Sequence, residues 1–287
     1  MRRTTTPAIR ACAAVAALLA LATACSSDSS DETDKATKAD RTTKTNKRGK
    51  ATADETGEKS LAEIVRKAAT KTGRTSARVD ETIVLRSGGQ EYTLSVSGPF
   101  DLARDKGKLS VDFPGGAIDH IDEVFTGGKV YVRPLSNLPE DQWLVTDRAK
   151  AEAHHLLRAP ANDPEHVLRQ ISAMRGVTDA GSTTIDGRPM ALYTGTIDHD
   201  TLAMGLAQKV RAPLDQVRDA QGDIPVTARA WVDEDGRLAR VELSCLVAAT
   251  TVDVTMNLSG FGKAVRVSPP DASQTVPGTL NGGVLPG

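Results

Sequence analysis

Apolar and polar residues alternate along most of the chain, which is the period-2 pattern of β-strands with one buried face. The clearest alternating runs lie at 226–232, 239–245 and 252–258. Shorter runs of the same kind lie at 79–85, 92–96, 109–113, 124–132 and 143–145, and strands return from about residue 177. Tight-turn signals separate neighbouring runs at Gly88-Gly89, Gly127-Gly128, Asp186-Gly187 and Asp235-Gly236. The pattern therefore predicts about nine or ten strands, many of them joined as antiparallel hairpins.

Helical periodicity interrupts the strand pattern at two well-marked places. Ser60 and Glu63 form a capping box ahead of an apolar stripe that stops at Gly73, so we expect a first helix to begin at Ser60. Asp163 and Pro164 form an N-cap and first-turn pair. The helix that they start has an apolar face made of Val167, Leu168, Ile171 and Met174.

Two further helices are expected on weaker signals. Asp147 is the expected cap of a helix that runs through Leu157, and Asp200 is the expected cap of a helix that carries Leu202, Leu206 and Val210. A less regular piece follows to about Gly222. Groups of strands with helices between them indicate an α+β fold with an antiparallel sheet, because parallel sheets come from regular βαβ alternation.

The N-terminal residues carry a targeting pattern. Three arginines precede an apolar run at 11–24, which is too short to span a bilayer. Cys25 follows small residues at the expected cleavage point, which is the mark of a bacterial lipoprotein whose cysteine takes a diacylglyceryl group. We expect a signal peptide at 1–24 and a protein held by acyl chains, such as palmitate, on the extracytoplasmic face of the cell membrane. The alternative is ordinary cleavage after Ala24 and a freely secreted protein.

Polar segments border the expected domain. Residues 25–59 read as the lipidated cysteine and a disordered tether, because the stretch after Cys25 has no large apolar residue. Residues 60–267 are long enough for one sizeable domain. Residues 268–287 read as a disordered tail rich in proline and glycine.

Composition narrows the functional classes. The chain of 287 residues has a formal charge of −1, and losing the three arginines of the signal leaves −1 − 3 = −4, which is not the balance of a nucleic-acid-binding protein. Of the three cysteines, Cys12 leaves with the signal and Cys25 is the lipid site, so Cys245 has no partner for an internal disulfide. Because aromatic residues make up only 3%, the core must consist mainly of Val, Leu, Ile and Ala.

No sequence motif for catalysis stands out, and we predict a protein that is not an enzyme and holds no metal or cofactor. His154-His155 with His166 is a histidine cluster, but neighbours on a helix point about 100° apart, which favours solvated surface over a metal site. Asp119, Asp122 and Glu123 around His120 are candidates for cation binding or acid–base work. We expect these acids on the exposed face of a strand or loop instead.

Two single residues have ordinary structural explanations. Cys245 lies in an alternating apolar strand, so we expect a buried small hydrophobe and not a nucleophile. Trp231 alternates with the small apolar residues of its strand and is expected on the outer sheet surface, as a cover or as part of a partner surface.

Several segments together resemble a known family. They are Leu61–Val65, Gly127–Arg133, Trp143, the Pro164 helix, the Ile185-Asp186-Gly187 turn and Trp231–Leu238. In order and spacing they resemble the LppX/LprA/LprF/LprG lipoproteins of mycobacterial and related cell envelopes, whose fold is similar to that of the lipoprotein carrier LolA. The resemblance implies a strongly curved antiparallel half-barrel sheet with helices packed on its concave face.

The resemblance also implies a function. Family members bind lipids or glycolipids in a hydrophobic cavity between sheet and helices and carry them within the envelope, so we expect a monomer whose partners are the membrane, a lipid and an envelope transporter or acceptor. The alternative is a non-catalytic module of the same fold that senses or binds a protein and has a collapsed cavity. The small side chains of the 226–232 run either leave room for an acyl chain or lie closely against a helix. The residues expected to line the cavity are Leu94, Val96, Leu109, Val111, Val130, Val132, Ile171, Val226, Ala228, Ala230, Val241, Leu243 and Val254.

Overall fold

One large sheet organises the protein. The computed structural model describes residues 48–280 except 117, 137 and 248, and it describes side chains from residue 57 onward. Within these residues twelve strands form one sheet in the order β12-β6-β5-β4-β3-β2-β1-β11-β10-β9-β8-β7. Because consecutive strands are mostly neighbours in the sheet, the chain forms two antiparallel meanders that meet where β1 pairs with β11.

The strands and helices have the following bounds. The strands are β1 (Ser76–Ser87), β2 (Gln90–Asp101), β3 (Lys106–Asp112), β4 (His120–Thr126), β5 (Lys129–Arg133), β6 (Trp143–Asp147), β7 (Arg175–Ile185), β8 (Arg188–Ile197), β9 (Val226–Val232), β10 (Leu238–Val247), β11 (Thr250–Ser259) and β12 (Thr275–Pro277). The helices are α1 (Arg48–Thr72), α2 (Pro164–Ser172), α3 (His199–Leu202) and α4 (Gln208–Gln221). Short 3-10 turns lie at Arg148–Lys150, Pro160–Asn162 and Ala272–Gln274.

The four hairpin signals are confirmed. Each joins an adjacent antiparallel pair, namely β1–β2, β4–β5, β7–β8 and β9–β10. The β4–β5 turn shows why the sequence is informative there. Gly127 and Gly128 both have positive φ, at 61° and 71°, which is the backbone of a type I′ turn and suits glycine better than any other residue.

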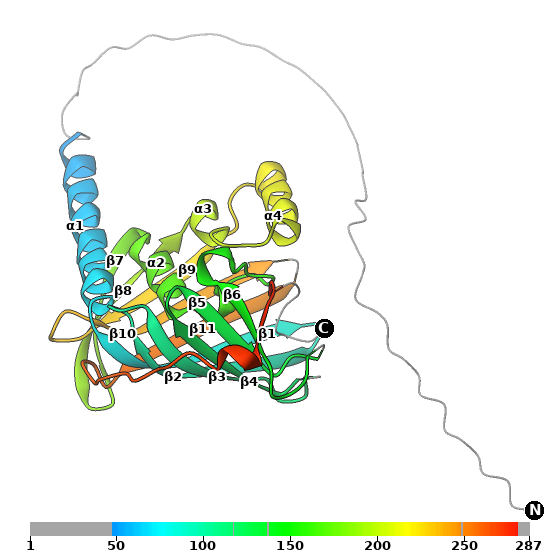
Figure 1. The fold of residues 1–287 in the computed structure, drawn as a ribbon. Coiled ribbons are helices and arrows are strands. Elements are labelled where there is room, and N and C mark those ends of the chain that lie inside the picture. The colour runs from blue at the N-terminus through cyan, green and yellow to red at the C-terminus, as the bar shows by residue number, and fades with distance from the viewer. Residues whose placement is uncertain (1–47, 117, 137, 248, 281–287) are drawn as a thin grey trace, which may run out of the picture. The chain divides into compact units, whose positions relative to one another are not determined.

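The α+β class and the curved, largely antiparallel sheet are confirmed, with the helices on one side of the sheet (Figure 1). Alternation along each strand turns one set of aliphatic side chains toward the helices, and these side chains form the buried core. The sheet is not antiparallel throughout, because β12 pairs in parallel with β6 at the sheet edge.

The expected starts of the first and third helices are wrong. Helix α1 begins at Arg48, so Ser60 and Glu63 lie inside the helix and no capping box starts it. The apolar stripe marked the buried face and not the helix end, because polar residues such as Lys and Glu are good helix formers without burial. Asp198, not Asp200, caps α3, and its side chain accepts a hydrogen bond from the Thr201 N–H at 2.9 Å.

Two other helix predictions are corrected. Asp147 ends β6, and only one 3-10 turn follows it, so no helix runs through Leu157. The piece expected to be irregular before Gly222 is helix α4, which contains Pro213. The predicted start of α2 is confirmed, because the Asp163 carboxylate accepts from the Glu165 N–H at 2.9 Å and Pro164 opens the helix. The helix ends at Ser172, so Met174, which was expected on its apolar face, lies beyond it.

The stretch from residue 268 is not a disordered tail as far as residue 280. Val276 of β12 pairs with Leu144 of β6. The Leu280 carbonyl lies 3.0 Å from Nε2 of His154. A proline is tolerated in β12 because the strand lies at the sheet edge, where one row of N–H groups needs no partner. Residues 281–287 lie outside the described residues, as do the signal peptide, Cys25 and the first part of the tether.

Candidate functional site

The residues expected to line a ligand cavity come together on the inner face of the sheet and on α2. All thirteen are buried, and none exposes more than 3% of its surface. Neighbouring strands place them side by side, for example Ala228 beside Leu243 and Leu243 beside Val254. The sequence pattern therefore identified one largely aliphatic surface, made of Leu94, Val96, Leu109, Val111, Val130, Val132, Ile171, Val226, Ala228, Ala230, Val241, Leu243 and Val254.

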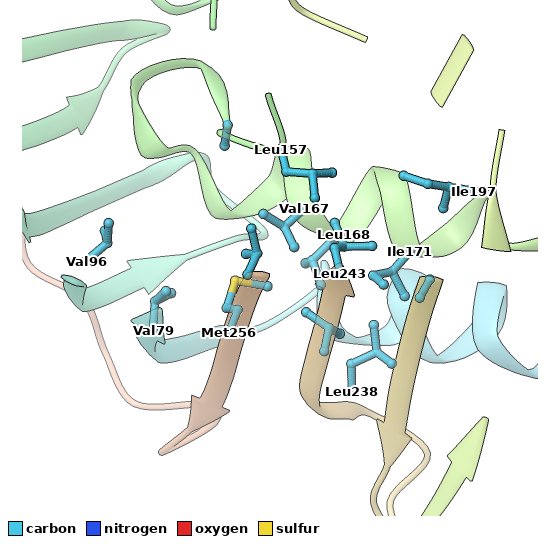
Figure 2. Packing of buried hydrophobic residues seen from close by; sticks show 14 of the residues in the cluster. Val79, Val96, Leu157, Val167, Leu168, Ile171, Ile197, Leu238, Leu243 and Met256 are labelled. Atoms are coloured by element: carbon cyan, nitrogen blue, oxygen red, sulfur yellow. The ribbon is translucent and has the colours of Figure 1, made fainter. Parts of the chain in front are cut away.

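In this structure the aliphatic surface is closed by other side chains. Figure 2 shows Val167, Leu168 and Ile171 of α2 lying over residues of the sheet such as Leu243 and Met256. A side chain with no exposed surface borders no space as wide as a water molecule, and nine of the thirteen have none. An acyl chain could therefore lie here only after α2 and its neighbouring segment move away from the sheet, and the lining role of these residues stays a prediction.

Hydrogen bonds connect the segments that cover the inner face of the sheet. The Ala153 N–H donates to the Gly205 carbonyl at 2.8 Å, and the Ala207 N–H donates to the Ala153 carbonyl at 2.8 Å. Helix α4 adds little burial, since Leu214 is its one fully buried side chain. A 2.6 Å contact between Nε2 of His199 and the Asp215 carboxylate joins α3 to α4. The segment 148–163, α2, α3 and α4, which we call the cover, thus consists of short pieces that support one another.

Arg148 fastens the cover near one edge of the sheet. Its guanidinium binds the Asp163 carboxylate through Nη2 at 2.6 Å and Nε at 3.1 Å, and it also forms an ion pair with Asp105. The same guanidinium lies over Phe100 and Phe125, whose rings meet edge to face at 5.1 Å. Charge and aromatic contact together hold the start of α2 at β2 and β4.

Two buried glutamates interrupt the aliphatic surface. Glu81 of β1 exposes 2% of its surface and Glu123 of β4 exposes none. Burial raises the pKa of Glu81 to about 7 and that of Glu123 to about 8, although the positive charge of Arg158 opposes both shifts. The expectation that Glu123 lies on an exposed face is therefore wrong.

A sequence signal for these glutamates existed. Glu81 lies in phase with Val79 and Ile83, so it must point to the same side of β1. Glu123 is in phase with the buried Ile121 and Phe125 on β4. The two acids thus occupy inward positions, and the alternation alone could have revealed them.

Two residues of the cover meet the acids. Asn162 donates through Nδ2 to Oε1 of Glu123 at 2.8 Å, and Arg158 donates through Nε to Oδ1 of Asn162 at 3.0 Å. Arg158 exposes 6% and Asn162 only 1% of their surfaces. The set of Glu81, Glu123, Arg158 and Asn162, which we call the polar cluster, therefore spans both layers.

The histidine candidates do not form a site. His155 and His166 are both largely buried, and burial lowers the pKa of each to about 4. His154 contacts the Leu280 carbonyl instead of a neighbouring histidine. Among residues 57–280 with described side chains, no three His, Cys, Asp or Glu residues are placed to hold a metal ion.

The strand pleat turns Glu123 away from His120 and Asp122, whose side chains share the other face and approach to 4.0 Å. His120 contacts Asp112 at 2.7 Å on the exposed side, and Asp122 pairs with Lys108 at 3.3 Å. Glu123 points the other way into the core. The group expected to be able to bind a cation therefore does not converge.

Cys245, Trp231 and a surface pocket lie apart from the polar cluster. Cys245 is buried and free, as expected, and burial raises the pKa of its thiol to about 11. Trp231 is only 7% exposed, because the Arg240 guanidinium lies 5.2 Å from its ring. A pocket of about 310 Å³ lies between α1 and α2, with Ala69, Leu102 and Leu168 among its lining residues.

Comparison with known proteins identifies the family. A family model described as LppX_LprAFG lipoprotein matches residues 99–267, which is more than half of the chain. The chain belongs to the LppX_LprAFG lipoprotein family. The resemblance seen in the sequence is confirmed, and the matched range covers most of the sheet together with the cover.

Several solved structures are similar to this chain at low identity. The LppX lipoprotein of Mycobacterium tuberculosis has 18% identity and a TM-score of 0.49, over 74% of this chain and 100% of that one. LprF from Mycobacterium bovis has 14% identity and a TM-score of 0.44, over 74% and 97%. A LolA superfamily protein from Nitrosomonas europaea has 10% identity and a TM-score of 0.31, over 74% and 94%. No curated protein matches the chain.

Two observations on this chain concern the membrane. No helix among the described residues is both long and apolar enough to cross a bilayer. Cys25, the expected lipidation site, lies outside the described residues, so its modification stays a prediction.

Proposed function

We propose that this protein binds a lipid or another acylated amphiphile between the sheet and its cover, and carries it within the cell envelope while anchored to the membrane through Cys25. The observation that carries the proposal is the largely aliphatic surface beneath a cover made of short elements. A cover of this kind can separate from the sheet piece by piece, because no single long element spans the surface.

The energetics favour an acyl chain as the occupant. Each CH₂ group that leaves water contributes about 0.8 kcal/mol. A chain of about a dozen CH₂ groups would therefore gain on the order of 10 kcal/mol. The small Ala228 and Ala230 side chains would leave the most room once Ile171 of α2 has moved.

The anchor suits a carrier. Two or more acyl chains on Cys25 would hold the protein firmly at the membrane, whereas one chain alone gives only reversible binding. The residues between Cys25 and α1 would let the domain reach from its own membrane toward an acceptor. The proposal needs no catalytic group, and the absence of enzymatic activity is part of it.

The closed packing favours a second candidate function. A module that senses or binds a protein would keep its interior filled, and the aliphatic surface is filled in this structure. In that case no lipid would enter, and the outer surface of the domain would carry the activity.

Lipid extraction separates the two candidates. A Cys25→Ser variant, which cannot carry covalent lipid at that position, would be purified, extracted with organic solvent and analysed by mass spectrometry. Co-purified acyl lipid in near-stoichiometric amount, or uptake of a fluorescent fatty acid by the extracted protein, is the expected result. Protein that neither carries nor takes up acyl chains would favour the sensing module.

A matched pair of variants places the binding inside the protein. Ala228→Val adds two methyl groups to the inward face of β9, whereas Thr227→Val changes the exposed neighbouring position. We expect only the inward change to reduce uptake of the fluorescent chain. Equal uptake by both variants would mean that the chain binds elsewhere.

A further inference from the structure

The polar cluster lies inside an otherwise aliphatic interior. Glu81 and Glu123 point inward from β1 and β4, with β2 and β3 between these strands. Across those strands their nearest inward neighbours are Val96 beside Glu81 and Leu109 beside Glu123. Any chain bound along this part of the sheet would pass the two carboxylates.

Three polar atoms of the cluster lack partners. They are Oε2 of Glu81, Oε2 of Glu123 and Nη1 of Arg158, each on a side chain that is more than nine-tenths buried. A buried polar group without a partner destabilises the folded protein, and more so when it is charged. Among the residues whose side chains the structure describes, Arg158 forms no ion pair with Glu81 or Glu123. Its Nε donates a hydrogen bond to Asn162 instead. The cluster is therefore only partly satisfied.

The charges of the cluster do not balance. When both glutamates are ionised, two negative charges face the one positive charge of Arg158. Asp163, the third acid nearby, is already paired with Arg148 at 2.6 Å and lies 3.8 Å from Arg169. Above about pH 8, where both glutamates are ionised, a group that restores balance must be positive and must donate hydrogen bonds to carboxylate oxygens.

We propose that the polar cluster binds the ammonium group of an amphiphile whose chain lies along the aliphatic surface. The ammonium has three N–H donors, and Glu81 and Glu123 each offer one carboxylate oxygen without a partner. Any acceptor atom next to the ammonium, such as a hydroxyl oxygen, would meet Nη1 of Arg158. This inference rests on the proposed function, since a chain must first be able to enter.

The segment that carries Arg158 and Asn162 has a strained backbone. Leu157, Ala161 and Asn162 have φ of 56°, 48° and 52°, in the left-handed region that is unfavourable for a non-glycine residue. Lifting this segment from the sheet would relax the backbone and expose both carboxylates together. Entry of the ligand and access to the cluster are thus one movement.

Binding of an ammonium group requires ionised glutamates. In the closed protein the pKa of Glu81 is about 7 and that of Glu123 about 8, so both acids hold protons below about pH 7. The facing groups are Arg158 and Asn162 from the cover, with Asp163 beyond them. Amine binding must therefore release protons, and the affinity for an amine should rise between about pH 6 and pH 8.5.

Three probes with the same chain test the proposal. Hexadecylamine, hexadecanol and hexadecanoic acid would each displace a fluorescent apolar probe from the full-length Cys25→Ser protein at about pH 8. We expect the amine to bind at least about tenfold more tightly than the alcohol, and the acid most weakly. The Glu81→Gln/Glu123→Gln variant should lose this preference and keep its affinity for the alcohol, whereas Glu91→Gln, an exposed change on β2, should keep both.

The possible results separate this inference from the proposed function. Failure of all three probes to bind would overturn both. Binding of all three probes with equal affinity would support a chain-binding interior and overturn the ammonium site. This is the result expected if buried water satisfies the polar cluster. A preference for amine that survives in the double variant would also overturn it. If the double variant does not fold, the single variant Glu81→Gln and the pH profile of the unchanged protein test the ammonium site. An affinity for the amine that stays constant from pH 6 to 8.5 contradicts the proposal.

Discussion

Replacing Glu123 by glutamine should stabilise the protein above neutral pH. Glu123 is fully buried, and burial raises the pKa of its carboxyl from 4.5 to about 8. Between these two values the unfolded chain has lost the proton and the folded protein has kept it. Folding is therefore weakened as the pH rises through this window, and the loss is complete above about pH 8.

The magnitude follows from the pKa values. Each pH unit between the unfolded and the folded pKa costs about 1.4 kcal/mol of unfolding free energy for one group. For Glu123 the whole window from 4.5 to about 8 amounts to roughly 5 kcal/mol, as an upper limit. Glutamine keeps an oxygen for the hydrogen bond from Asn162 and carries no charge. We expect Glu123→Gln to differ little from the unchanged protein near pH 5 and to be several kcal/mol more stable at pH 8.

Urea denaturation at about pH 5, 6, 7 and 8 would measure these free energies. Glu81 should still produce a decline up to about pH 7 in the variant, because its pKa is also raised. Glu91→Gln removes the same charge from the exposed end of β2 and should run parallel to the unchanged protein. If the Glu123→Gln curve also runs parallel, Glu123 is already ionised in the folded protein and the reasoning is refuted.

Three further predictions concern packing, backbone and thiol chemistry. Ile171→Ala in α2 should lower the unfolding free energy by about 2–5 kcal/mol, as urea denaturation would show. Ile64→Ala, at a position that is 37% exposed, should lower it by less than about 1.5 kcal/mol. Equal losses would mean that α2 does not pack as described. Gly98→Ala should destabilise by more than about 3 kcal/mol, because a Cβ there meets the Lys108 carbonyl oxygen, whereas Gly89→Ala in an open turn should cost only about 1–2 kcal/mol; similar melting temperatures for the two would contradict this. The Cys245 thiol, whose pKa burial raises to about 11, should resist iodoacetamide at pH 8 until urea unfolds the protein; rapid labelling of the folded protein would show that the thiol is accessible.

Local patterns predicted the strands and the inner face well. Alternation with a period of two specifies which side of a strand each residue occupies, so the aliphatic surface could be named before any contact was known. Hairpin signals such as Gly127-Gly128 specify which strands are neighbours, because the turn backbone requires those residues. The cap of α2 at Asp163 was equally readable, since the bond that starts the helix is made by adjacent residues.

Features that depend on distant segments were predicted poorly. The start of α1 was misplaced because a polar helix can continue beyond its buried stripe. The pairing of β12 with β6 was missed because a three-residue edge strand carries little periodic signal. Glu123 was expected at the surface because a charged residue is usually exposed. The alternation of buried and exposed positions along β4 contradicts this expectation.

An α+β protein with antiparallel hairpins, an inward aliphatic face and a lipoprotein-like start can be predicted from the sequence, since each of these is encoded in residues close together along the chain. Tertiary packing sets two further features: the cover closes the face, and Asn162 bonds both Glu123 and Arg158 inside it, where Glu81 is also buried. The physical reason is that periodicity specifies the side to which a residue points. What fills the space on that side, and which distant charges share it, depends on how the two layers pack.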